Sequence, residues 1–514
     1  MILAAAPAVE VLIVVALALA TAGWLLAVAP RPRAAAGLGV LLLAPVALLV
    51  SVTGDNESSL PHFSPMLIAA GLVAGALALT LAAACCLRFS RWVIPAALIA
   101  LPLRVPLVVG GDSVKLLLPL YLVIAGAVVA EVWKTRHGDA LPVRAPRRLD
   151  MLLAAFFVLY ALQSAYSPDA AVAMRNFAFF YAPFALLYGI AANQRWDAAL
   201  LRACATAVVV LALLLVGAGF VEYARGQYLI RPGGIKPNDF DPYFRIQSLF
   251  FDPNIFGRFV ALVMLTVAAL MIYTKRTSRV FAAAAVLAVL WAGLVLTLSQ
   301  SSFAALLAGL VVLAAMRWNT RRVLTVTGVI AFAGLTFALA VPSVSGIDLR
   351  NSRSAETTTS GRFDLVTGGV KLWGERPLVG HGSGGFAAAF ERGSLAADSA
   401  FGSPTTTKSH TAPLTVAAEQ GALGLAVFLA LLWTAFSAVY RRAGADGQPG
   451  VVARAAVAAA FTALFVHSLA YAALFEDPLS WMLLGMAVSL AAIPLSGTDE
   501  AEPAESAAAE AAAA

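Results

Sequence analysis

Long runs of apolar residues, separated by short polar stretches, occupy most of this 514-residue chain. A helix that crosses a bilayer needs about 20 mostly apolar residues, and about 15 runs approach that length. The sequence therefore predicts an all-α polytopic membrane protein with about 12–15 transmembrane helices. The predicted spans lie near residues 9–29, 34–53, 66–86, 92–108, 116–133, 150–165, 175–192, 200–223, 255–273, 280–298, 302–316, 323–341, 412–438, 451–473 and 480–495. The short runs at 92–108 and 302–316 are also candidates for re-entrant segments.

The composition points to the same class of protein. Hydrophobic residues make up 61% of the chain and charged residues 12%, whereas a soluble domain carries about 25% charged residues. Cys85, Cys86 and Cys204 all lie in apolar runs, which is typical of small core residues and not of a disulfide framework. The first apolar run has no basic residues before it, so we expect a retained span and not a cleaved signal peptide.

Lysine and arginine are concentrated in alternate loops between the predicted spans. Cytoplasmic loops of membrane proteins carry an excess of these residues, so the basic loops are assigned to the cytoplasm. Their basic residues are Arg31, Arg33, Arg88, Arg91, Lys134, Arg136, Arg144, Arg147, Arg148, Arg195, Arg202, Lys275, Arg276, Arg279, Arg317, Arg321, Arg322, Arg441, Arg442 and Arg454. The intervening loops, which include 55–59, 224–254 and 342–411, are then extracytoplasmic.

This topology divides the chain into six segments. They are N-terminal transmembrane helices (1–223), a first large extracytoplasmic loop (224–254), central transmembrane helices (255–341), a long extracytoplasmic loop (342–411), C-terminal transmembrane helices (412–495) and an acidic, alanine-rich cytoplasmic tail (496–514). The tail has the composition of a disordered segment and is not expected to take part in chemistry.

Twelve further basic residues fall in or beside the two large extracytoplasmic loops, where topology does not call for positive charge. They are Arg225, Arg231, Lys236, Arg245, Arg258, Arg350, Arg353, Arg362, Lys371, Arg376, Arg392 and Lys408. Some can pair with neighbouring acids, and others are candidates for binding an anion such as a diphosphate, which arginine contacts bidentately. Arg258 is the strongest candidate, because it lies inside a span, where a lone charge is costly and usually functional. Asp252 and Asn254 just before it are predicted helix caps.

Residues 360–424 form the most polar and glycine-rich part of the second half of the chain. Apolar residues recur at helical spacing from Phe363 to Trp373, which predicts an amphipathic helix in the outer interface that ends near Gly374 and Pro377. The following GHGSGGF (380–386) allows positive φ and close backbone approach, so its amides are candidates for cradling an anion. A plain flexible turn is an equal alternative.

His410 lies in the sequence KSHTAPL, at the predicted start of the span 412–438. Ser409 or Thr411 can cap this helix, and Pro413 is tolerated in its first turn. The positive end of the helix dipole disfavours a cation, which would keep the imidazole neutral and able to accept a proton. A simple polar boundary residue is the alternative. Glu419 lies half a turn round the helix from His410, so the two do not form a dyad on one face.

Four segments together resemble the O-antigen ligase and O-antigen polymerase family. These are FRIQSLFFDPNIFGR (244–258), TLSQSSFAALLAGL (297–310), GRFDLVTGGVKLWGERPLVGHGSGGF (361–386) and SHTAPLTVAAEQGALGL (409–425). Their order resembles the family's arginine-to-tryptophan helix, P-L-x-G-x-G-x-G turn, histidine and E-x-G-x-x-G-L motif. The chain departs from the family pattern at Thr411, where asparagine is common, and at Ser299-Gln300-Ser301-Ser302, where a serine-arginine pair is usual.

The resemblance implies a GT-C-type, inverting, metal-independent glycosyltransferase of the bacterial cytoplasmic membrane. Such an enzyme takes a glycan from a polyprenyl diphosphate carrier on the outer face and needs no cofactor. His410 is the expected general base, and Arg258 and Arg362 are expected to stabilise the leaving diphosphate. Expected substrate-binding residues are Arg245, Asn254, Gly382, Gly384 and Lys408. The acceptor is a glycan, a lipid or a protein, and ligase and polymerase activity both remain open.

Two alternatives stay open at the level of sequence. A metal-dependent GT-C transferase would use a carboxylate pair in the first outer loop, where Asp55 and Glu57 are the candidates. A transporter or flippase for lipid-linked glycans would use ionisable residues near span ends, for which Glu131, Glu222 and Glu419 are candidates. Nucleic acid is not an expected partner, because membrane topology and the outer basic clusters account for the net charge of +7.

Overall fold

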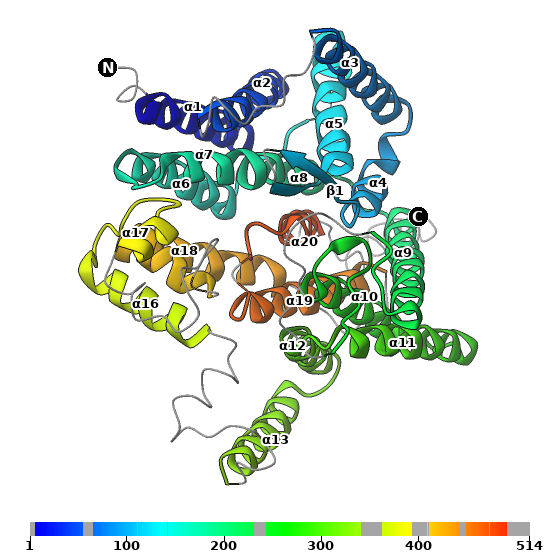
Figure 1. The fold of residues 1–514 in the computed structure, drawn as a ribbon. Helices are drawn as coiled ribbons and strands as arrows, with labels where there is room; N and C mark the ends of the chain where they lie inside the picture. Colours follow the sequence, from blue (N-terminus) through cyan, green and yellow to red (C-terminus); the bar gives the residue numbers. More distant parts are fainter. Residues whose placement is uncertain are drawn as a thin grey trace, which may run out of the picture.

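A computed structural model of the protein describes residues 6–54, 65–109, 112–140, 142–230, 243–340, 362–392, 409, 411–440, 449–471 and 473–490. Within these residues the chain is almost entirely helical (Figure 1). The helices of the first half are α1 (Ala6–Leu26), α2 (Pro30–Gly54), α3 (Pro65–Arg88), η1 (Ser90–Trp92), α4 (Val93–Ala100), α5 (Leu118–His137), α6 (Arg148–Gln163), η2 (Ser164–Tyr166), α7 (Ala170–Asn176), η3 (Phe177–Tyr181), α8 (Ala182–Ala192) and α9 (Ala198–Arg225). Those of the second half are η4 (Ser248–Phe250), α10 (Pro253–Tyr273), α11 (Thr277–Thr297), α12 (Gln300–Arg317), α13 (Thr320–Ala340), α16 (Arg362–Glu375), α17 (Phe386–Arg392), α18 (Ala412–Tyr440), α19 (Pro449–Ser468) and α20 (Pro478–Leu490).

Twelve helical segments in the described part of the chain are long and apolar enough to cross a membrane. They are α1, α2, α3, α5, α6 with η2, the continuous run α7–η3–α8, α9, α10, α11, α12, α18 and α19. The predicted class of polytopic all-α membrane protein is thus confirmed. The predicted span at 323–341 also falls on a helix, α13, which is not among the twelve. The run at 302–316 is part of the continuous 18-residue helix α12, so a re-entrant segment there is not supported.

The predicted span at 92–108 is wrong. The helical part ends at Ala100, and the chain continues into strand β1 (Val105–Val109), which pairs antiparallel with β2 (Asp112–Leu116). Pro102 and Pro106 explain the change, because proline lacks the backbone N–H that would continue the helical hydrogen bonds. The predicted span at 480–495 is described only as the 13-residue helix α20, which is also too short to cross alone.

α10 forms the centre of the second half of the molecule. It packs against α9, α11, α12 and α19, and most of its residues are buried. A helix that is apolar on all sides belongs in the interior of a bundle. Gly257 allows close approach of α12 to the start of α10, because a Cβ at this position would lie 2.8 Å from the Ser302 hydroxyl and 2.9 Å from the Thr297 hydroxyl. The N-terminus of α10 is therefore fixed against the start of α12.

α16 and α17 lie together against α18 at one side of the bundle (Figure 1). α16 covers the predicted amphipathic segment and ends at Glu375, two residues before Pro377, as the sequence predicts. The Trp373 indole nitrogen donates to the Pro377 carbonyl oxygen at 3.2 Å and so closes the end of the helix. These two short helices and the turn between them form most of the described part of the long loop 342–411, which also includes residues 409 and 411.

Candidate functional site

Arg258 and Asp477 form an ion pair in the interior of the helical bundle. Their side chains are 4% and 5% exposed, so both charges are removed from solvent. Arg258 lies in the second turn of α10, and Asp477 immediately precedes α20. Each charge compensates the other, since a buried ion without a partner would cost several kcal/mol.

Two helices begin at this place with the same Asp-Pro sequence. Asp252 caps α10, where its Oδ1 accepts from the backbone N–H groups of Asn254 at 2.7 Å and Ile255 at 3.1 Å. Asp477 caps α20 in the same way, with the Leu479 N–H at 2.8 Å. The predicted cap at Asp252 is confirmed, whereas Asn254 is not a cap. Proline at the first helical position and an aspartate before it explain why both helices start here.

Tyr471 joins the cluster from the connection between α19 and α20. Its hydroxyl donates to Asp252 Oδ2 at 2.7 Å. Burial, together with the negative charge of Asp252, raises the pKa of Tyr471 above its usual value. Tyr471 therefore remains a neutral hydrogen-bond donor at physiological pH.

Arg104 and Arg245 extend the positive charge around Arg258. Arg104 follows the short helix α4 and lies close enough to Asp477, Arg258 and Asp252 for their charges to affect its pKa. Burial has the largest effect and lowers the pKa of Arg104. Arg245 donates from Nη2 to Asn254 Oδ1 at 2.9 Å and from Nε to the Thr297 carbonyl oxygen at 2.9 Å. The buried Nε atoms of Arg104 and Arg258 have no hydrogen-bond partner among the described residues. Two donors are therefore left in a buried, positively charged site.

A serine-rich turn at the start of α12 borders this cluster. The Ser302 hydroxyl donates to the Asn254 carbonyl oxygen at 3.3 Å, and Ser299 and Ser302 share a hydrogen bond at 2.8 Å. The Ser301 hydroxyl lies 3.1 Å from Nε2 of His467, which is buried in α19. His467 was not among the predicted site residues, because a single histidine in an apolar run carries no distinctive spacing.

The N-terminus of α18 is tied to the same region through the α19–α20 connection. The Thr411 hydroxyl donates to the Leu469 carbonyl oxygen at 3.0 Å, two residues before Tyr471. Ser409 donates from its hydroxyl to the Thr411 carbonyl oxygen at 2.9 Å and shares a hydrogen bond with Thr415 at 2.9 Å. The residues on either side of His410 are thus connected, through one short segment, to Asp252 and the arginine cluster.

Three predicted site residues have side chains that the structure does not describe. His410 and Lys408 lie outside the described residues, and Arg362 is described only by its backbone position at the start of α16. Asp55 and Glu57, the candidates for a metal-dependent site, also lie outside the described residues. Of the eight predicted site residues, the structure brings together Arg258, Arg245 and Asn254.

Gly382 and Gly384 lie in a turn that is held by Glu419 of α18. The Glu419 carboxylate accepts from the N–H groups of Gly384 at 3.0 Å and Phe386 at 3.3 Å, and its backbone carbonyl oxygen accepts from Gly382 at 2.8 Å. The amide groups of both glycines therefore already have an acceptor within the protein. Both residues have positive φ, +98° and +73°, which explains why glycine is needed there.

Gly421 completes the contact from the side of α18. Its φ of +66° interrupts the helix, and its lack of a Cβ allows close approach to the backbone of Leu378. The N–H groups of Ala422 and Leu423 donate to the carbonyl oxygens of Pro377 and Leu378 at 2.7 and 3.2 Å. The E-x-G-x-x-G-L segment and the glycine turn thus fit together as one unit, which is how the described structure uses both motifs.

Replacing Glu419 by glutamine should lower the apparent melting temperature of the protein. The amide group of glutamine would place an NH₂ donor opposite one of the two backbone N–H donors, and losing a buried hydrogen bond to a charged acceptor costs about 1.5–3 kcal/mol. Thermal unfolding of the purified protein measures this effect. Glu391→Gln is the matched control, because Glu391 is exposed in α17. Equal melting temperatures for wild type and Glu419→Gln would contradict the role of Glu419 in stabilising the glycine turn.

The carboxylates suggested for a transport pathway have structural partners as well. Glu222 accepts from the N–H groups of Gln247 at 3.1 Å and Ser248 at 2.9 Å, and Glu131 pairs with Arg33 at 2.8 Å. Together with Glu419, these groups hold loops and helices in place. No observation in the described residues favours the transporter over a transferase.

Comparison with known proteins finds a family match within the second half of the chain. Residues 285–429 match the family model Wzy_C, described as O-antigen ligase. The matched region runs from α11 into α18 and includes the serine-rich turn, α16, the glycine turn and the segment that begins at Glu419, while Arg245 and Arg258 precede it. No curated protein matches the chain. The resemblance is thereby confirmed for the motifs that lie within residues 285–429, where this multi-pass helical membrane protein is similar to the O-antigen ligase family.

Proposed function

We propose that the protein transfers a glycan from a polyprenyl diphosphate carrier to an acceptor hydroxyl on the outer face of the bacterial cytoplasmic membrane. The O-antigen ligase domain implies transferase activity on lipid-linked glycans. The lipid bilayer holds both the enzyme and the carrier, so donor and active site meet at the membrane surface. The reaction is inverting and metal-independent in this proposal.

The buried arginine cluster is the observation that carries the proposal. Three arginines surround the N-terminus of α10, and the buried Nε donors of Arg104 and Arg258 lack protein acceptors among the described residues. Unpaired buried donors are costly, so such a site favours an anionic ligand. A diphosphate offers several oxygen acceptors, and arginine binds phosphate oxygens in bidentate geometry. Arg104 was not predicted as a site residue and joins Arg258 and Arg245 here.

The proposed step is a direct displacement at the anomeric carbon. The acceptor oxygen forms a bond to C1 while the bond from C1 to the diphosphate oxygen breaks, and the electron pair of that bond remains on the diphosphate. The arginines stabilise this developing charge in a site shielded from water, where electrostatic stabilisation is strongest. Attack from the face opposite the diphosphate inverts the configuration at C1.

His410 takes the proton of the acceptor hydroxyl in this proposal. Its neighbours Ser409 and Thr411 are tied to the start of α18 and to Leu469. The positive end of the α18 dipole favours the neutral imidazole, which is the form that accepts a proton. Arg362 is the further candidate for stabilising the leaving group, and Lys408 is a candidate for substrate binding.

Asn254, Gly382 and Gly384 keep positioning roles in this scheme. Asn254 holds the guanidinium of Arg245 at 2.9 Å, so its loss would remove one of the hydrogen bonds that orient Arg245. Gly382 and Gly384 shape the turn that packs on α18, and a Cβ at either position would collide with the backbone of Ser167 or Ala173.

Transfer activity with and without EDTA tests the proposal. Purified protein should move the glycan of a polyprenyl diphosphate oligosaccharide to an acceptor mixture, and the rate should be unchanged by EDTA. Thin-layer or mass-spectrometric detection of the free polyprenyl diphosphate and the extended acceptor measures both products. Loss of all transfer in EDTA, with recovery on adding a divalent cation, would instead place catalysis at a metal site such as Asp55 and Glu57. Absence of transfer to any acceptor would overturn the proposal.

A further inference from the structure

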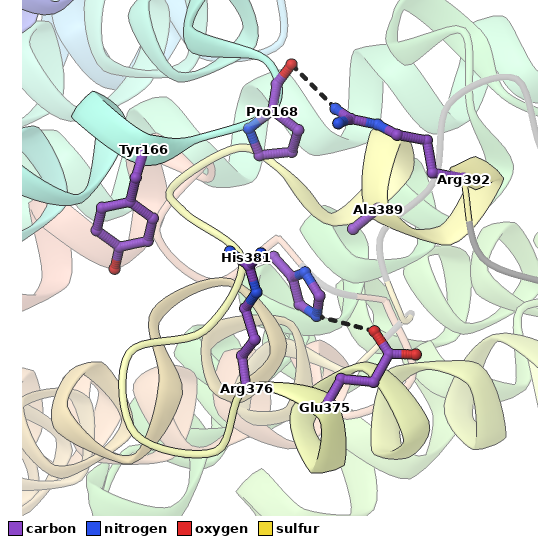
Figure 2. A pocket seen from close by; sticks show the side chains of 7 residues that line it. All are labelled: Tyr166, Pro168, Glu375, Arg376, His381, Ala389 and Arg392. Atoms are coloured by element: carbon purple, nitrogen blue, oxygen red, sulfur yellow. Dashed lines mark hydrogen bonds and ion pairs between the residues drawn. The ribbon is translucent and has the colours of Figure 1, made fainter.

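A separate cavity of about 280 Å³ lies between α16, α17 and the connection of α6 to α7 (Figure 2). Its wall includes Arg376, His381 and Arg392, none of which belongs to the cluster around Arg258. Ligand sites usually have volumes of about 300–1,000 Å³, so this cavity suits a ligand no larger than about one sugar residue. No step proposed above uses these residues.

Two arginines from different elements provide the positive charge of the cavity. Arg392 donates from Nη2 to the Pro168 carbonyl oxygen and from Nε to the Ala388 carbonyl oxygen, each at 3.2 Å, so its guanidinium is held in place. The Arg376 guanidinium makes no hydrogen bond or ion pair with the described part of the chain and extends beside His381 in Figure 2. The cavity thus contains one guanidinium that is held by hydrogen bonds, that of Arg392, and one that is available for a ligand, that of Arg376.

Hydrogen-bond acceptors lie beside these donors. Nε2 of His381 is 3.0 Å from the Leu372 carbonyl oxygen and 3.5 Å from Glu375 Oε2. Because a carbonyl oxygen only accepts, the hydrogen is assigned to Nε2, and Nδ1 of the neutral ring is then an acceptor. A small inorganic anion would use only the hydrogen-bond donors of the cavity wall and not its acceptors. A sugar that carries hydroxyl groups and one acidic group can use the arginines together with Glu375 and His381.

The cavity is rigidly connected to α18. The backbone N–H of His381 donates to the Ala418 carbonyl oxygen at 3.0 Å. Ala418 is next to Glu419, which holds the rest of the turn. The Tyr166 hydroxyl donates to the Val379 carbonyl oxygen at 2.6 Å and fixes the opposite wall. A ligand in this cavity would therefore contact a turn that is hydrogen-bonded to α18, the helix that begins just after His410.

We propose that this cavity binds an acidic sugar residue of the acceptor glycan, with Arg376 and Arg392 contacting its carboxylate or phosphate. Binding of an acidic sugar stands on the geometry of the cavity alone, whereas its assignment to the acceptor rests on the proposed function. In that function the donor diphosphate occupies the arginine cluster at α10, which is built from other elements. On this ground we assign the cavity on α16 and α17 to the acceptor chain.

Binding of labelled digalacturonate to the full-length protein in detergent tests the cavity. Wild type should bind this acidic disaccharide, and Arg376→Gln and Arg392→Gln should each weaken binding about tenfold or more, because each loses a hydrogen bond between charged groups. Lys371→Gln is the matched control, since Lys371 is exposed on α16 and does not line the cavity. Neutral galactobiose should bind equally to all variants.

Three outcomes would overturn parts of this inference. Equal digalacturonate binding by wild type and Arg376→Gln would remove the acidic subsite. Full competition by inorganic phosphate at the same concentration would make the cavity a simple anion site. Displacement of digalacturonate by farnesyl diphosphate would exclude the acceptor assignment, because donor and acceptor must bind together. The binding assay is independent of the transfer assay. Specific digalacturonate binding by a protein that shows no transfer would contradict the proposed transferase reaction and still support the sugar site.

Discussion

Replacing Arg258 by alanine should destabilise the protein by about 3–5 kcal/mol, because it leaves a buried carboxylate without its counter-charge. Asp477 is 5% exposed and would lose its ion-pair partner in the bundle interior. The apparent melting temperature in detergent should fall clearly relative to wild type. Loss of transfer in this variant alone would therefore not separate catalysis from folding.

The double variant Arg258→Gln/Asp477→Asn separates the two effects. The two amide groups keep nearly the shape of the ion pair, can share a hydrogen bond in its place and leave no uncompensated charge in the bundle. Its melting temperature should recover most of the loss, while transfer should remain about 10²–10³-fold below wild type. Arg279→Gln, at the exposed start of α11, is the control. A stable double variant with wild-type transfer would exclude Arg258 from leaving-group stabilisation.

The hydrophobic pattern predicted the helical bundle because each span is encoded locally. α10 illustrates this, since its apolar run, Asp-Pro start and length were all readable in residues 252–273. The segment 92–108 was predicted wrongly because its average hydropathy is high throughout. Pro102, Arg104 and Pro106 carried the information that the helix stops, and a window average hides three residues of this kind.

The candidate site was predictable only in part. Arg258 was found because a charge inside an apolar run is unusual. Arg104 carried the same signal but was overlooked within the supposed span at 92–108. Asp477 repeats the Asp-Pro helix start of Asp252, and that repetition was the available sequence signal. The meeting of these residues depends on packing between segments that are far apart in the sequence, which no local pattern encodes.

The glycine turn shows how a motif can be located correctly and interpreted differently. Sequence alone left a choice between an anion cradle and a plain turn for GHGSGGF. The structure gives a third arrangement, in which Glu419 supplies the negative charge that the turn amides bind. Glu419 follows Gly384 by 35 residues, so its role required knowledge of how the turn packs on α18.

Replacing His410 by alanine should reduce transfer by about 10²–10⁴-fold, the usual contribution of a general base. The wild-type rate should rise with pH between about 5.5 and 7.5, where an ordinary histidine loses its proton and becomes able to accept one. His410→Ala should lose this rise along with most of its rate, while its melting temperature stays near that of wild type. His137→Ala, exposed at the end of α5, serves as the control and should keep both rate and pH profile. A folded His410→Ala protein with the wild-type rate and profile would exclude His410 as the base, and the proton would then have to pass to another group near the N-terminus of α18.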